Sequence, residues 1–407
     1  MTRQPLPSRG FTALLCATSG AYAADQLALA AIPLVAILLL DASAREVGLL
    51  VAIHSAAWLI ISMPAGILVD RLDRRRVARL TQTLAAAALA FATLATLKGW
   101  TIGLGATIFV AAGGSVTFML AAIAITPGLV ASTQFARANA RIELVRGAVT
   151  IVAPLIAGAL AARGAPHAAL ALAGLGALWA AFTLRWVPSD PPVPAPAAHE
   201  SILAAMRSGA AFVREEPLMR AIALCAICWN FAYFALIAIF VPFALERIGL
   251  HAGAVGLVQS VFGIGSIAAA LLATALFARI RPQIFLVAGP ASSVLAACLL
   301  FASARTGGIF LAGASYFLLG FAPMLWFICQ TTLRQTITPQ ALLGRVSATI
   351  QVAIYGVRPL GALAGGALAD AAGFDAALML VIAAFSASAL VAWLSPLGRL
   401  RAMPASA

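Results

Sequence analysis

The 407-residue chain is 63% hydrophobic and only 10% charged, which is too few charges to cover the surface of a water-soluble domain, so lipid should surround most of it. Its formal net charge of +13 would favour a nucleic-acid partner in a soluble protein, but its basic residues fall in loops between apolar runs, without aromatic side chains that stack on bases. Composition therefore predicts a membrane protein that binds no nucleic acid.

Apolar runs of about 20 residues, the length needed to cross a bilayer, recur along the whole chain. They predict twelve spanning helices, at residues 11–40, 46–69, 77–97, 101–130, 141–163, 167–187, 218–245, 252–278, 283–304, 307–333, 346–369 and 374–395. The first run resembles a cleavable signal peptide, because basic residues precede it and AYA precedes Ala24. Its apolar character continues to Leu40, so we expect an uncleaved first helix.

The long break between apolar runs spans residues 188–217 and begins with the proline-rich sequence PSDPPVPAPAAHE. Proline bars a spanning helix there. The apolar residues that follow are spaced for an amphipathic helix on the membrane surface: Ile202, Leu203, Met206 and Val213. We therefore predict a six-helix half at 1–187, a cytoplasmic linker at 188–217 and a second six-helix half at 218–407.

Lysine and arginine are distributed unevenly between the two sides of the predicted helices. If both termini face the cytoplasm, the basic residues of the outer loops are Arg45, Lys98, Arg163, Arg247 and Arg305, and most of the others lie inside. The positive-inside rule thus predicts a multi-pass protein of the bacterial cytoplasmic (inner) membrane with both termini in the cytoplasm.

The two predicted halves repeat short patterns at a spacing of 208 residues: Gly48 returns as Gly256, and Gly158 returns as Gly366. Parallel repeats of this kind build the two halves of some secondary transporters. In those proteins the substrate site lies between the halves, near the middle of the membrane.

The segment 64–76, PAGILVDRLDRRR, is a basic turn between the second and third predicted helices. It resembles the signature loop of the major facilitator superfamily, G-x-L-A-D-R-x-G-R-R-x-x-L, with matches at Gly66, Leu68, Asp70, Arg71, Arg74 and Arg75. Residues 332–366 and the amino-terminal run through Asp25 resemble the branch of that superfamily with enterobactin-exporter-type and macrolide-efflux-type proteins.

This resemblance implies an all-α membrane protein of twelve transmembrane helices in two pseudo-symmetric halves, which move in alternating access. It also implies a conformational latch between the basic turn and the start of the eleventh helix, formed by Gly66, Asp70, Arg71, Arg74, Arg75, Gly344 and Arg345. The alternative for this turn is a solvated charged loop. The stretch 153–158 resembles the G-P-x-x-G-G sequence of exporters and antiporters. The arginine that the superfamily has in its fourth helix is missing from this chain, because residues 101–130 contain no charged residue.

Asp25 and Arg358 are charged residues near the middle of predicted spans. A mid-bilayer charge on a single helix costs about 3 kcal/mol, so Asp25 should face protein or water. Burial favours the protonated carboxyl, which suits proton coupling. Arg358 could bind an anion or pair with Asp25, or it could bond the carbonyl that Pro359 frees. We predict that both couple protons or substrate, with a structural role as the alternative for each.

Glu143 and Arg146, three residues apart near the inner end of the fifth predicted span, can pair. We predict that they stabilise a cytoplasmic gate rather than bind substrate. His54 could titrate near neutral pH, but we expect a neutral histidine packed against serine or a backbone carbonyl. Cys225 and Cys228 form a C-x-x-C pattern inside an apolar run, which favours packing over zinc or redox chemistry, so we predict no metal site.

Aromatic and amide side chains within the spans are candidates to line a substrate cavity, since they offer stacking surface and a few hydrogen-bonding groups. The candidates are Tyr22, Gln26, Trp229, Asn230, Tyr233, Trp326, Gln330, Gln351 and Tyr355. Filling of the core is the alternative for the large aromatic residues.

These features predict a secondary active transporter that exports a moderately hydrophobic organic solute, such as a drug, siderophore or metabolite, in exchange for protons. Lys98 is the single lysine, so the phosphate-gripping G-x-x-x-x-G-K-[ST] loop is absent and no cofactor is expected. The scattered ionisable residues do not indicate an enzyme. The alternatives are an importer or facilitator of a small metabolite and a non-transporting membrane sensor. We expect a monomer whose partners are a small-molecule substrate, protons and the lipid bilayer.

Overall fold

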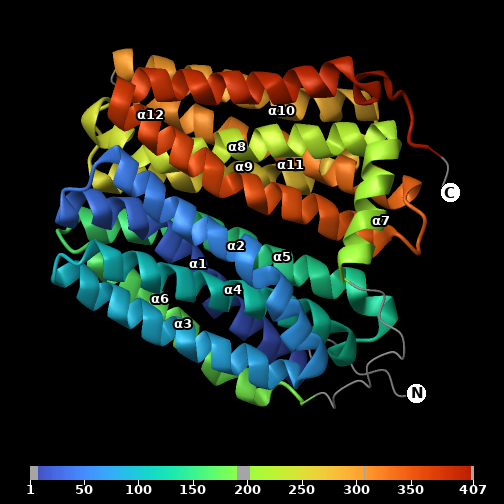
Figure 1. Ribbon diagram of the computed structural model, residues 1–407, viewed down its shortest axis with the longest axis horizontal. Helices are drawn as coiled ribbons and strands as arrows, with labels where there is room; N and C mark the ends of the chain where they lie inside the picture. The colour runs from blue at the N-terminus through green and yellow to red at the C-terminus, as the bar shows by residue number, and fades with distance from the viewer. Residues whose placement is uncertain (1–7, 190–201, 307, 405–407) are drawn as a thin grey trace. The chain divides into compact units, whose positions relative to one another are not determined.

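The computed structural model describes residues 8–189, 202–306 and 308–404, and all regular elements in these residues are helices (Figure 1). The helices are α1 (Arg9–Leu40), α2 (Ala44–Arg71), α3 (Arg74–Leu97), α4 (Thr101–Leu129), α5 (Phe135–Ala162), α6 (His167–Thr183), α7 (Ile202–Glu215), α8 (Pro217–Glu246), α9 (Ala252–Phe277), α10 (Pro282–Thr306), α11 (Ile309–Ile337) and α12 (Leu343–Leu394). Short 3-10 turns are η1 (Ser132–Gln134), η2 (Leu184–Trp186) and η3 (Pro396–Arg399). The prediction of an all-α membrane protein is confirmed.

Helix α12 contains a break at Gly373, where the backbone has φ 85° and ψ 167°. An unbroken helix of its 52 residues would be about 78 Å long, more than twice the bilayer's apolar thickness of about 30 Å. Within the described residues, eleven helices are long and apolar enough to cross a membrane, and α12 is the longest of them. Because α12 divides at Gly373, each of the twelve predicted spans has a helical counterpart.

The amphipathic helix predicted in the linker is α7, which packs against α12. Arg345 donates from Nη1 to Ser208 Oγ at 3.3 Å, and Thr349 Oγ1 donates to the Met206 carbonyl at 3.5 Å. A Cβ at Gly209 would lie 2.6 Å from the Arg345 carbonyl oxygen, so the two backbones approach closely. The proline-rich residues 190–201 lie outside the described part of the chain.

The chain divides into two compact units. Unit 1 comprises Met1–Ser43, Ile53–Pro196 and His251–Ser260, and unit 2 comprises Ala44–Ala52, Ala197–Leu250 and Val261–Ala407. Helices α2 and α9 are each divided between the units, a division that the apolar pattern did not indicate. The halves 1–187 and 218–407 stay a prediction.

Unit 1 is built around α1, which packs against α4, α5 and α6, while α3 packs against α4 and α6. Its core includes buried apolar residues from α1, α3, α4 and η2, among them Leu14, Val77, Phe118 and Leu184. Helix α3 starts at the basic turn, where the Asp73 carboxylate accepts a hydrogen bond from the Arg76 amide at 3.0 Å. Asp73 therefore caps the helix at the position that glycine occupies in the signature loop.

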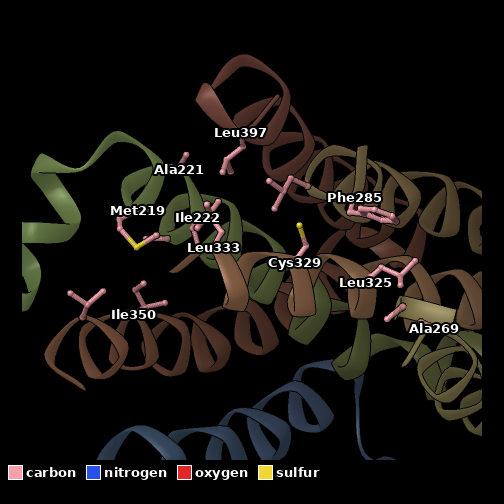
Figure 2. Packing of buried hydrophobic residues seen from close by; sticks show 14 residues of the cluster. Met219, Ala221, Ile222, Ala269, Phe285, Leu325, Cys329, Leu333, Ile350 and Leu397 are labelled. Atoms are coloured by element: carbon pink, nitrogen blue, oxygen red, sulfur yellow. The ribbon is translucent and has the colours of Figure 1, made fainter. Parts of the chain in front are cut away.

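Unit 2 is organised by the packing of α8 on α12 and of α10 on α11. Figure 2 shows part of its core, in which side chains from several helices and from η3 gather. Met219, Phe285, Leu333 and Leu397 are buried there. Leu397 is fully buried, so the turn that follows α12 is held to the helical core rather than to solvent.

Candidate functional site

Unit 1 contains a pocket of about 400 Å³ between α1, α2, α4 and α5. Its volume falls in the range of small-molecule sites, roughly 300–1,000 Å³. The lining residues are Thr18, Ala21, Tyr22, Asp25, Trp58, Ser115, Phe118, Met119, Ala122, Ile123, Thr126, Pro127, Phe135, Asn139, Ile142, Glu143 and Arg146. Most of this wall is apolar or aromatic, and the charged side chains in it are Asp25, Glu143 and Arg146.

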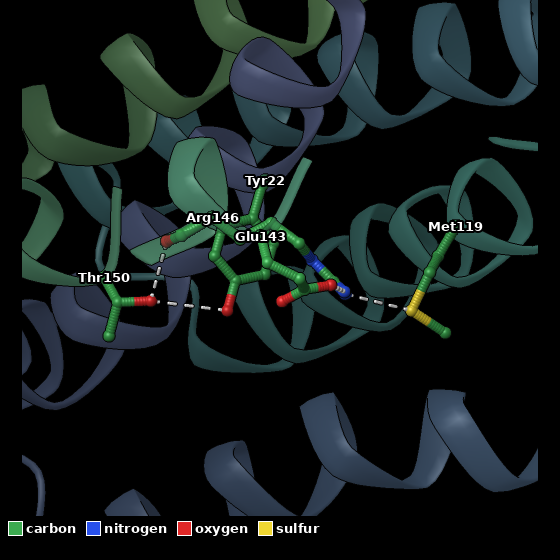
Figure 3. A network of polar contacts seen from close by, with 5 residues as sticks. All are labelled: Tyr22, Met119, Glu143, Arg146 and Thr150. Carbon is green, nitrogen blue, oxygen red and sulfur yellow. Dashed lines mark hydrogen bonds and ion pairs between the residues drawn. The ribbon is translucent and has the colours of Figure 1, made fainter. Parts of the chain in front are cut away.

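A polar network in one wall of the pocket joins α1 to α5 (Figure 3). Arg146 Nη1 donates to Glu143 Oε1 at 2.9 Å, and Arg146 Nη2 donates to Met119 Sδ at 3.3 Å. The Arg146 guanidinium also lies 5.0 Å from the centre of the Tyr22 ring, a cation–π contact. On the other side, Tyr22 Oη and Thr150 Oγ1 are 3.4 Å apart, and Thr150 donates to the Arg146 carbonyl.

The Glu143 side chain is 64% exposed, whereas that of Arg146 is 28% exposed. An ion pair this open contributes little to stability. Its carboxylate and guanidinium are nevertheless in the pocket wall, where a bound solute could exchange contacts with either group. The sequence predicted the pairing of Glu143 with Arg146 but placed the pair in a cytoplasmic gate; that role stays a prediction.

Asp25 and His54 lie together in the interior of unit 1. Asp25 is 6% exposed and His54 is 4% exposed. His54 Nε2, on α2, is 3.4 Å from Asp25 Oδ1, on α1, while Gln26 Nε2 donates to Asp25 Oδ2 at 3.2 Å. The sequence did not indicate that His54 is a neighbour of Asp25. The composition of two apolar helices does not show which of their sides face each other.

Arg358 lies in unit 2 and is held by α8 and by its own helix, α12. Its Nε donates to Asn230 Oδ1 at 3.0 Å, and its guanidinium carbon is 4.9 Å from the ring centres of both Phe234 and Tyr355. Asn230 in turn donates to the Ala226 carbonyl. The amide therefore positions the guanidinium between two aromatic rings. Whether Arg358 pairs with Asp25, in the other unit, stays a prediction.

Two other aromatic candidates of unit 2, Trp229 and Tyr233, form a stack with Phe262. The Trp229 and Tyr233 rings are stacked with centres 4.8 Å apart, and Tyr233 is stacked with Phe262 at 5.6 Å. Trp229 Nε1 donates to Ser293 Oγ at 2.9 Å. This arrangement is compatible both with substrate stacking and with core filling, the two alternatives predicted for these side chains.

Three further candidates lie on α11 and α12. Gln330 is buried and donates to Phe327 and Thr331 of its own helix. Trp326 is partly buried, and Gln351 is exposed. All three belong to unit 2 and are not part of the unit 1 pocket; their contact with substrate stays a prediction.

The basic turn is fixed by arginine bonds to backbone carbonyls. Arg74 Nη1 donates to the Ala124 carbonyl at 3.1 Å, and Arg75 Nη1 donates to the Val187 carbonyl at 3.0 Å. These bonds tie the start of α3 to α4 and to the end of η2. Asp70 is exposed. Gly66, Asp70 and Arg71 belong to unit 1, whereas Gly344 and Arg345 belong to unit 2, so the latch between them stays a prediction.

Within the described residues, no three His, Cys, Asp or Glu side chains are grouped so that they could hold a metal ion. Cys225 is buried beside Ser388 Oγ, 3.2 Å from its Sγ. It is positioned to pack against α12.

The Major Facilitator Superfamily model matches residues 14–362, which is most of the chain. The chain belongs to the major facilitator superfamily. The superfamily is one of transporters, so this is a multi-pass membrane transporter and not an enzyme, and the resemblance of its signature loop is confirmed.

Named relatives within the superfamily include the enterobactin exporter EntS of Citrobacter koseri, 29% identical over 316 residues, which cover 75% of this chain and 72% of the relative. EntS of Escherichia coli O1:K1 is 28% identical over the same shares. The predicted branch of the superfamily is thereby confirmed.

Solved structures of other superfamily transporters share the fold. The nucleoside transporter NupG has a TM-score of 0.75 at 14% identity, covering 94% of this chain and 97% of NupG. A POT family transporter in complex with 5-aminolevulinic acid has a TM-score of 0.75 at 13% identity, covering 95% and 96%. A bacterial homologue of the human lysosomal transporter Spinster, inward-facing and unoccupied, has a TM-score of 0.71 at 16% identity, covering 98% of each chain.

Proposed function

We propose that this transporter exports a moderately hydrophobic organic solute, a drug, siderophore or metabolite, by alternating access and in exchange for protons. The observation that carries the proposal is the unit 1 pocket of about 400 Å³ with its largely apolar and aromatic wall. The relatives named as enterobactin exporters support the outward direction.

The chemistry of the pocket wall favours a solute with a large apolar surface and few polar groups. Tyr22, Trp58, Phe118 and Phe135 offer ring faces, which contribute most of the contact energy in sites of this kind. The single arginine of the wall already pairs with Glu143. A sugar phosphate or another compact polyanion would find no second cation in this wall.

Asp25 and Arg358 are the residues that we propose to couple transport to protons. Asp25 lines the pocket and is buried at mid-helix, so its protonation state acts directly on what the pocket can bind. Arg358 is a partly buried cation of unit 2 that is held by Asn230.

The conformational cycle is proposed to follow the superfamily pattern of two rocking halves, 1–187 and 218–407. Asp70 and Arg71 of the basic turn would latch the start of α12, and Glu143 and Arg146 would help to close the pocket on its cytoplasmic side. We propose that the protein works as a monomer in the bacterial inner membrane, with both termini in the cytoplasm.

Everted membrane vesicles test direction and coupling together. An exporter should accumulate radiolabelled enterobactin or ethidium inside such vesicles when a proton gradient is present, and nigericin, which dissipates the pH gradient, should abolish the accumulation. Asp25→Asn should lose the gradient-driven accumulation. Asp375→Asn, a surface carboxylate that pairs with Arg247 in unit 2, should retain it.

Three outcomes contradict parts of this proposal. Accumulation in right-side-out vesicles under an inward proton gradient would favour the importer alternative. Export that continues in the presence of nigericin would show that the pH gradient does not drive transport. Gradient-driven export in a folded Asp25→Asn protein would remove Asp25 from coupling.

A further inference from the structure

His54 is a buried titratable side chain that the transport scheme above does not use. Its Nε2 lies 3.4 Å from Asp25 Oδ1, yet the two atoms are not aligned as a hydrogen bond, and neither has another hydrogen-bond partner among residues 8–189, 202–306 and 308–404. Both side chains are more than nine-tenths buried. Two orphaned polar atoms therefore face each other across the contact between α1 and α2.

An unpaired buried polar atom destabilises the folded protein, and a buried charge without a partner destabilises it more. A single proton held between Oδ1 and Nε2 removes both penalties at once. Carried on the carboxyl, it lets Asp25 donate to a neutral imidazole. Carried on the imidazole, it makes an ion pair. Transfer between the two forms breaks one O–H bond and forms one N–H bond, so the number of bound protons stays the same.

The other charged groups near this pair come mainly from α5. Asp25 lies close enough to Tyr22 and Arg146 to interact electrostatically with both, and Glu143 interacts with the same two groups. Helix α4 contributes no ionisable residue, and α6 contributes only His167, at its first residue. Arg146, on α5, is thus a nearby fixed cation, and it is already engaged by Glu143 at 2.9 Å.

Asp25 lines the pocket, whereas His54 is not part of the pocket wall. The carboxylate therefore has one side toward the solute and another toward the imidazole. A solute that binds the Asp25 carboxylate competes with His54 for that carboxylate. A protonated His54 likewise competes with the solute for Asp25.

We propose that Asp25 and His54 form one shared proton-binding site behind the pocket, in which His54 is the second proton carrier. The inference rests on the proposed proton-coupled transport, since it names the residue that completes the coupling site. It predicts that His54 sets the pH range over which Asp25 binds its proton, and that removing either side chain changes the behaviour of the other.

The test needs no substrate, because it follows the two groups directly. Protein labelled with ¹⁵N-histidine and reconstituted in lipid is titrated by NMR, with the His54 resonance assigned by its loss in His54→Gln. Infrared difference spectra of the same samples follow the carbonyl stretch of the protonated Asp25 carboxyl, assigned by its loss in Asp25→Asn. In the wild type both signals should change over one common pH range.

Each single substitution should move the remaining signal. In Asp25→Asn the His54 resonance should change over a pH range displaced by about one unit or more, and in His54→Gln the Asp25 band should be displaced similarly. Asp375→Asn removes an exposed carboxylate of unit 2 that pairs with Arg247, so it should leave the His54 range nearly unchanged. The resonance of His251, the residue before α9, serves as an internal reference in every sample.

A His54 resonance with the same pH range in wild type and Asp25→Asn would overturn the shared site, even if vesicles show proton-coupled export. Separate pH ranges for the two signals in the wild type would overturn it as well, and this result requires no variant to fold. Conversely, mutual displacement of the two signals with no transport of either probe would leave the shared site standing and reject the proposed function.

Discussion

Gly158 and Gly256 pack so closely that a Cβ on Gly158 would lie 2.8 Å from the Gly256 Cα atom. The same relationship recurs in unit 2, where a Cβ on Gly48 would lie 2.9 Å from the Gly366 Cα atom. These four glycines form two of the glycine pairs that the sequence repeats at a spacing of 208 residues. The repeat thus preserves two equivalent crossings, α5 with α9 and α2 with α12, at which only glycine lets the backbones approach.

Replacing one of these glycines should destabilise the fold. Gly158→Val places two methyl groups against the α9 backbone, and overpacking of this kind costs about 1–3 kcal/mol. The melting temperature of the detergent-purified protein should fall. Gly366→Val, in unit 2, should lower the melting temperature in the same way. Gly313→Ala is the control, because no atom lies within 4 Å of its Cβ position. A Gly158→Val protein that melts like the wild type would show that the crossing can widen without cost.

Gly209 should control the docking of α7 on α12. A valine there would clash with the Arg345 carbonyl and with Thr349 Oγ1, each 2.6 Å from the Cβ position. We expect Gly209→Val to release α7, so that limited trypsin digestion cleaves faster at Arg207 and Arg214 while the spanning helices stay protected. Gly344→Ala, with nothing within 4 Å of its Cβ, should be digested like the wild type. Equal cleavage in both variants would mean that α7 is held by other contacts.

The fold could be predicted largely from local sequence. A run of about 20 apolar residues predicts a span by its length alone, and the break at Gly373 fell between the predicted spans 346–369 and 374–395. The division of α2 and α9 between the units could not be predicted. It depends on which helices pack together, and an apolar run does not indicate which other helix it contacts.

The candidate site was predicted residue by residue but not as a constellation. Asp25 was identified because a charge within a span is costly, and Glu143 and Arg146 because their spacing on one helix lets them pair. Their common pocket depends on how α1, α4 and α5 are rotated, and helices that are apolar on all sides carry little rotational signal. The contact of His54 with Asp25 was missed for the same reason.

Asn230 should stabilise unit 2 through its bond to Arg358. Asn230→Ala removes the acceptor of the Nε–H group, at 3.0 Å, and loss of a hydrogen bond to a charged group costs about 1.5–3 kcal/mol. We expect a lower melting temperature than for Gln330→Ala, a matched buried amide that donates within its own helix. Equal effects of the two substitutions would show that the bond from Arg358 to Asn230 does not stabilise unit 2.

Arg146 should set the charge preference of the unit 1 pocket. Its guanidinium pairs with Glu143 at 2.9 Å and covers the Tyr22 ring, so it neutralises one of the two carboxylates in the wall. Arg146→Met keeps a long side chain but leaves Glu143 open to a bound cation, which should tighten ethidium binding about tenfold, or about 1.4 kcal/mol, in a fluorescence titration. Arg137→Met, an exposed arginine of α5 outside the wall, should change it little. Weaker ethidium binding in Arg146→Met would mean that the arginine holds the wall together rather than offsetting its charge.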